Sequence, residues 1–206
     1  MVEQKITVDD KSLVRALGTL RGRADIVIAR AANRTITTTN KAMSKGVRER
    51  YPKVKDGDVK KALFKRRANA SNPTAELTYK SMHENLYKHG FVSPQKIVKT
   101  GYGTEPDPKF YKARVMKDSP MYPLMERPRP FVQMMSNGHV GLFRRKTQDG
   151  MKFYRGAHKR NAIEAVYAPA ISQMMKNDEV LQETEKVAGK AFLKRLEHEI
   201  DWELRR

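Results

Sequence analysis

The sequence predicts an α+β fold in which a long N-terminal helix and a C-terminal helix pack on a small antiparallel sheet. Two segments with a helical repeat of apolar residues flank a region of short extended segments and turns. The 206 residues suffice for a buried core, and we expect one domain over residues 1–206. Seven of the ten prolines lie at about 94–130, which excludes long helices there. That proline-rich segment is either a surface loop or an arm that docks on a neighbour.

The first helical segment follows a short extended stretch at residues 6–8. Apolar and small residues recur at steps of three and four from Leu13 to Ala42, which places them on one helix face. Gly18 and Gly22 each lower helix stability by about 1 kcal/mol relative to alanine, so we expect a bend near them. The helix should end at Tyr51-Pro52, because proline disfavours the α conformation of the residue before it.

A short helix and a strand pair are predicted next. Asp56 and Asp58 are alternative N-caps for a helix over residues 59–63. Residues 63–68 and 75–80 then predict two strands around a turn at residues 69–74, because Asn72-Pro73 is typical of a turn.

The clearest hairpin in the sequence lies near residue 137. It joins residues 131–135 to residues 139–144 through Ser136-Asn137-Gly138. Asn-Gly supplies the positive φ angles of a type I′ turn, which we therefore expect here. A third strand is expected at residues 151–156.

The C-terminal segment predicts an amphipathic helix capped by Asn177 or Asp178. Its apolar face should be buried. The segment before it should position the helix, either in the core of the same chain or at a subunit interface. The residues predicted for this packing or interface role are Val166, Tyr167, Pro169, Ile171, Phe192, Leu196, Ile200 and Leu204.

Positive charge dominates the chain and is unevenly distributed. The net charge is +19, and residues 178–206 contribute −2 of it. Residues 41–67 hold 11 basic and three acidic side chains, and residues 144–160 hold seven basic side chains and one acidic side chain. Such runs attract phosphate backbones without reading sequence, or dock on acidic protein, or are ordinary solvated surface. The candidate contacts with DNA or an acidic partner are Arg144, Arg145, Lys146, Lys53, Lys55, Lys60 and Lys61.

No pattern in the sequence favours catalysis, a metal or a cofactor. The five histidines form no pair with metal-ligand spacing, and the chain has no cysteine. Neither a Gly-x-Ser-x-Gly nor a Walker phosphate loop occurs. No apolar run approaches the roughly 18 residues that would indicate a membrane span, and no signal peptide is visible.

Several segments together resemble the minor tail protein Z family of long-tailed phages. The first is Ala29-Arg30-Ala31-Ala32-Asn33-Arg34-Thr35, followed by residues 47–51 and 54–63. The second is residues 165–175, with Ala168 and Ser172 where the family usually has glycine and proline. The Phe131 hairpin with its basic Phe143-Arg144-Arg145-Lys146 strand is similar in character. The resemblance covers residues 24–67 and 130–206.

The resemblance implies a structural, non-enzymatic virion protein that is made in the host cytoplasm and completes the head-proximal end of the tail. Its implied neighbours are the tail terminator and head connector proteins, and the simplest implied assembly is a sixfold ring around the DNA channel. The basic composition leaves an alternative, a free nucleic-acid-binding protein without sequence specificity. A ring protein should show a defined oligomer or assemble on a partner ring, whereas a free binder should bind duplex DNA with strong salt dependence.

Overall fold

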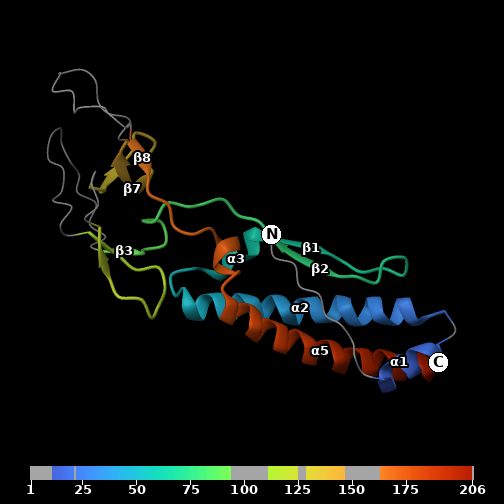
Figure 1. The fold of residues 1–206 in the computed structure, drawn as a ribbon. Coiled ribbons are helices and arrows are strands. Elements are labelled where there is room, and N and C mark those ends of the chain that lie inside the picture. The colour runs from blue at the N-terminus through green and yellow to red at the C-terminus, as the bar shows by residue number, and fades with distance from the viewer. Residues whose placement is uncertain (1–10, 21, 94–110, 125–128, 147–162, 206) are drawn as a thin grey trace, which may run out of the picture. The chain divides into compact units, whose positions relative to one another are not determined.

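The computed structural model describes residues 11–20, 22–93, 111–124, 129–146 and 163–205 (Figure 1). The predicted mixture of helices and antiparallel strands is confirmed, with the described strands arranged in three small sheets rather than one. The chain forms two compact units. The first unit comprises Met1–Glu49, Val54–Met82 and Ile171–Arg206, and the second comprises Arg50–Lys53 and His83–Ala170. The single domain over 1–206 stays a prediction. The strands expected at 6–8 and 151–156 and much of the segment 94–130 lie outside the described residues.

Two long helices dominate the first unit. Helix α1 (Lys11–Gly18) and helix α2 (Ala24–Arg50) are separated where the sequence predicts a bend, and Gly22 has a φ of +84°. Helix α2 ends just before Tyr51-Pro52, as predicted. Helix α5 (Asp178–Leu204) lies beside α2 (Figure 1), and the predicted cap Asn177 accepts hydrogen bonds from two backbone amides of its first turn.

The core between these helices includes an apolar cluster near the N-terminal end of α2. Val27 and Ala31 of α2 form one cluster with Phe192, Leu196 and Ile200 of α5. Farther along, a β-carbon at Gly46 would lie 3.2 Å from Cγ1 of Val180, so the two helices approach closely there. Small residues on α2 therefore allow the close packing of α5.

Helix α3 (Asp56–Ala62) leads directly into strand β1 (Leu63–Arg66), which pairs with β2 (Glu76–Tyr79). The N-cap of α3 is Lys55 and makes no side-chain cap bond, so the predicted Asp56 or Asp58 cap is wrong. Both aspartates lie in the first turn instead, where negative charge is favourable near the helix N-terminus. The short helix α4 (Ile171–Met174) packs against α3.

We call β1, β2 and their connecting turn, residues 63–79, the ribbon. It is attached to α2 by two side chains. Oδ1 of Asn33 accepts from the Ala68 amide at 2.9 Å while Nδ2 donates to the Ala68 carbonyl at 2.8 Å. The hydroxyl of Tyr79 donates to Oδ1 of Asn40 at 2.9 Å. Figure 1 shows the ribbon as an extended hairpin.

The second unit holds two three-stranded antiparallel sheets. One contains β3 (Val92–Ser93), β4 (Lys112–Ala113) and β5 (Tyr122–Pro123). The other contains β6 (Phe131–Met134), β7 (Val140–Arg145) and β8 (Ile163–Ala165).

The turn between β6 and β7 differs from the predicted type I′ turn. The Gly138 amide donates to the Met135 carbonyl at 2.9 Å, and the Met135 amide donates to the His139 carbonyl at 2.8 Å. Gly138 has a φ of +77°. This is a three-residue connection with glycine in the left-handed region, so the hairpin is confirmed but its turn type is not.

Candidate functional site

The segment that carries the second part of the resemblance is held by residues 84–86. The Leu86 amide donates to the Val166 carbonyl at 2.8 Å, and the Ala168 amide donates to the Glu84 carbonyl at 2.8 Å. Asn85 and Tyr167 thereby form an isolated antiparallel bridge. Segment 166–168 therefore continues beyond β8 as extended chain.

Asn85 also connects this segment to β7 through its side chain. Its Oδ1 accepts from the Leu142 amide at 2.8 Å, and its Nδ2 donates to the Leu142 carbonyl at 2.8 Å. The side-chain amide of Asn85 thus makes the pair of hydrogen bonds to Leu142 that the backbone of a neighbouring strand would otherwise make. A β-carbon at Gly141 would lie 2.8 Å from that Nδ2, so only glycine leaves room for this contact.

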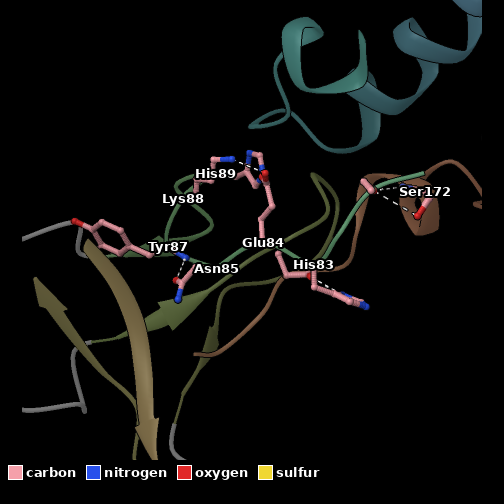
Figure 2. A network of polar contacts seen from close by, with 9 residues as sticks. His83, Glu84, Asn85, Tyr87, Lys88, His89 and Ser172 are labelled. Carbon is pink, nitrogen blue, oxygen red and sulfur yellow. Dashed lines mark hydrogen bonds and ion pairs between the residues drawn. The ribbon is translucent and has the colours of Figure 1, made fainter. Parts of the chain in front are cut away.

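A small ionic network follows on the same segment. Figure 2 shows the Glu84 carboxylate between Lys88 and His89; Nε2 of the buried His89 lies 2.6 Å from Oε2 of Glu84. Burial raises the pKa of Glu84, but the hydrogen bonds and charges of Lys88 and His89 outweigh it and leave the pKa below its ordinary value. Within the described residues, no group of three histidine, aspartate or glutamate side chains could hold a metal ion.

The residues predicted for packing or a subunit interface divide into buried and exposed sets. Ile171, Phe192, Leu196 and Ile200 are buried, and Val166 is half-buried. Tyr167 is 60% exposed, Leu204 is 57% exposed, and Pro169 is exposed. The ring of Tyr167 is therefore outside the core, which leaves its interface role as a proposal.

Two glutamates on α5, Glu199 and Glu203, are buried, although no sequence pattern predicts it. Glu203 accepts from Nη1 of Arg23 at 2.8 Å and from Nη1 of Arg30 at 3.0 Å. Oε1 of Glu199 lies 3.1 Å from Nε of Arg34. The hydrogen bond from Arg23, followed by that from Arg30, holds the pKa of Glu203 below its ordinary value. The α2–α5 contact thus combines an apolar cluster with three ion pairs.

The predicted basic residues of β7 differ in how they are held. Nε of Arg144 lies 2.5 Å from Oε1 of its cross-strand neighbour Glu164. The guanidinium of Arg145 lies 5.7 Å from the ring centroid of Phe131, and Lys146 is exposed. Only part of this charge is directed solely at solvent.

The second predicted basic set is divided between the units. Lys55, Lys60 and Lys61 belong to the first unit and Lys53 to the second, and all four are exposed. Nζ of Lys60 lies 2.7 Å from Oδ2 of Asp56, one helical turn earlier. Lys65, Arg66 and Arg67 belong to the basic run 41–67 but not to the predicted contacts, although all three are exposed on the ribbon. Their clustering in a strand next to a helix was the signal that could have found them.

Comparison with known proteins identifies a family. A family model described as prophage minor tail protein Z (GPZ) matches residues 11–206. Neither the curated proteins nor the solved structures include a significant match. Among the described residues, no helix is both long and apolar enough to span a membrane.

Proposed function

Because the chain belongs to the minor tail protein Z family of phages and is therefore a structural protein of the phage tail, we propose that it completes the tail at its head-proximal end. In this role it contacts the tail terminator and head connector proteins and acts without catalysis or a cofactor. Copies form a ring around the DNA channel, most simply with sixfold symmetry. The observation that carries the proposal is the family match over nearly the whole chain.

The charge of the chain supports a ring that faces an anionic partner. Each copy has a net charge of +19, so copies packed side by side repel one another unless their cations face negative charge. Exposed cations occur in both units, on α3 and the ribbon in the first and at the end of β7 in the second. DNA in the channel supplies negative charge whatever its base sequence, because every nucleotide carries a phosphate. Contacts with phosphates position a protein without reading bases.

Named residues carry each part of this proposal. The contacts with DNA, or with an acidic ring of a neighbouring protein, are made by cations at the end of β7, on α3 and before α3: Arg144, Arg145, Lys146, Lys53, Lys55, Lys60 and Lys61. Exposed Tyr167 and Pro169 form the candidate subunit contact, because a tyrosine ring offers a large contact area at low entropic cost.

A free, non-specific nucleic-acid-binding protein is the second candidate, and the same net charge favours it. The two candidates differ in assembly. Native mass spectrometry of the purified chain, alone and with the tail terminator and connector proteins, should give a defined oligomer or a complex with a partner ring. A monomer or dimer that binds duplex DNA and neither partner would favour the free binder.

Charge variants on β7 separate DNA contact from protein docking. Reversing Arg144 would place two carboxylates opposite each other at Glu164, so Arg144→Gln with Lys146→Glu is the cleaner test. Glu164→Gln is the matched control, because it removes the same ion pair and keeps both cations.

Phage particles that carry these variants give three distinct outcomes. If β7 faces DNA, heads and tails still join but particles retain or eject DNA abnormally. If β7 docks on an acidic ring, heads and tails fail to join. Normal titres from the double variant would contradict both roles for β7.

A further inference from the structure

Strand β1 of the ribbon and the residue after it expose consecutive side chains, whereas residues 76–78 of β2 are half-buried. Phe64, Lys65, Arg66 and Arg67 are all exposed, and successive side chains of a strand point to opposite faces. The ribbon is fixed on α2 at Ala68, just after β1, and at Tyr79, the last residue of β2, and both residues are buried. The β1 side of the ribbon is therefore held in place and uncovered.

The uncovered part is strongly cationic and only weakly neutralised. The ribbon contains three basic side chains, Lys65, Arg66 and Arg67, and one acidic side chain, Glu76. Nη1 of Arg66 lies 3.5 Å from Oε1 of cross-strand Glu76, an exposed pair of the kind that contributes little to stability. Lys65 and Arg67 have no ion pair within the described part of the chain. Nζ of Lys80, at the base of the ribbon, lies 5.9 Å from the ring centroid of Phe64.

The same charges argue against a second copy of the chain as the occupant. Strand pairing between two β1 edges would bring Lys65, Arg66 and Arg67 of one copy beside those of the other, and edge lysines are a common protection against such pairing. The turn asparagines are engaged locally, because Oδ1 of Asn69 accepts from the Asn72 amide and Oδ1 of Asn72 accepts from the Thr74 amide. They are therefore poorly placed for reading bases.

We propose that the ribbon binds the sugar-phosphate backbone of duplex DNA through Lys65, Arg66 and Arg67, without sequence preference. A two-stranded antiparallel ribbon is narrow enough to enter the major groove, and lysine and arginine neutralise the phosphates that line it. This inference rests on the proposed passage of DNA through a ring, and it assigns the contact to residues outside the predicted basic sets.

The test measures how duplex binding by the full-length chain depends on salt. Fluorescence anisotropy with a random-sequence duplex gives the slope of log binding constant against log salt concentration, which changes by about 0.9 per phosphate contact. Lys65→Gln with Arg67→Gln should make the slope shallower by about 2. Lys190→Gln with Lys194→Gln removes the same charge from exposed positions of α5 and should leave the slope close to wild type.

Two further variants keep the test independent of folding. Lys65→Arg with Arg67→Lys retains both charges and should keep the wild-type slope, whereas Arg67→Gln alone should change it by about 1. Fluorescence of the single tryptophan, Trp202 in the first unit, checks that each variant is folded.

The outcomes separate this inference from the proposed function. A ribbon variant with the wild-type slope, or an equal loss in the α5 control, overturns the ribbon contact but leaves DNA binding by other residues. Wild-type chain that binds polyglutamate but not duplex DNA overturns the ribbon contact and the DNA role together, and favours docking on acidic protein.

Discussion

Asn85 and Gly141 should be strongly coupled, because one side chain fills the space that the other residue leaves empty. In Asn85→Ala, the Leu142 amide loses its acceptor in a residue that is 0% exposed. The Leu142 carbonyl still accepts from the Val166 amide at 2.9 Å. One buried unsatisfied donor, together with the lost bond from the Tyr87 amide, should lower the free energy of unfolding by about 2–4 kcal/mol.

Gly141→Ala should be destabilising for the complementary reason. The new β-carbon would lie 2.8 Å from Nδ2 of Asn85, 3.0 Å from its Cγ and 3.0 Å from Cζ of Phe143. Such overpacking lowers the free energy of unfolding by about 1–3 kcal/mol. In the Asn85→Ala background two of these three contacts disappear, so the alanine should cost about 1 kcal/mol less than in wild type.

Hydrogen exchange of the β7 amides measures the stability of this sheet in the two single variants and in the double variant. Both single variants should speed exchange at residues 140–145, and the double variant should exchange more slowly than additivity requires. Protection in α5 and the fluorescence of Trp202 should not change, because both report on the first unit. Free energies that add to within about 0.3 kcal/mol would refute the coupling, and equal loss of protection in α5 would show global unfolding instead.

Four other expectations follow from burial and charge. Leu196→Ala, at a site 0% exposed, should lower the free energy of unfolding by about 2–5 kcal/mol in urea titrations, whereas Leu204→Ala, at a site 57% exposed, should change it little. Asn177→Ala removes a helix cap and should lower it by about 1 kcal/mol, read as a lower melting temperature. The lowered pKa of Glu203 stabilises the fold above its ordinary value of 4.5, and this stabilisation is lost as pH falls through the lowered pKa; in Glu203→Gln, tryptophan fluorescence should show a smaller acid-induced loss. Tyr167→Ala should keep the wild-type melting temperature and impair head–tail joining; a large drop in melting temperature would contradict its exposure.

Local signals in the sequence predicted the helices and hairpins well. Proline at 52 and asparagine at 177 mark helix ends by backbone chemistry that does not depend on distant contacts. The turn at Ser136-Asn137-Gly138 was predicted in the right place, but two turn types accept the same residues. Hydrogen bonds to neighbouring strands decide between those types, and they are not visible in a local pattern.

The buried face of α5 was predicted only in part, because it includes charged residues as well as apolar ones. Helical spacing identified Phe192, Leu196 and Ile200, which are buried. It also favoured Leu204, whereas the structure buries Glu199 and Glu203. A glutamate at helical spacing normally indicates a solvated face, because burying an unpaired carboxylate is costly. The arginines that make burial acceptable lie about 170 positions earlier in the chain.

These ion pairs also affect which cations of the first unit are available to an anionic partner. Arg23, Arg30 and Arg34 pair with Glu199 and Glu203, so part of their charge is offset by acids of α5. The two glutamates are correspondingly withdrawn from any basic partner, although they contribute to the negative charge counted for residues 178–206. Within the described residues, the cations of the ribbon have one exposed ion pair, between Arg66 and Glu76. We therefore expect an approaching polyanion to meet the ribbon cations more readily than Arg23, Arg30 and Arg34.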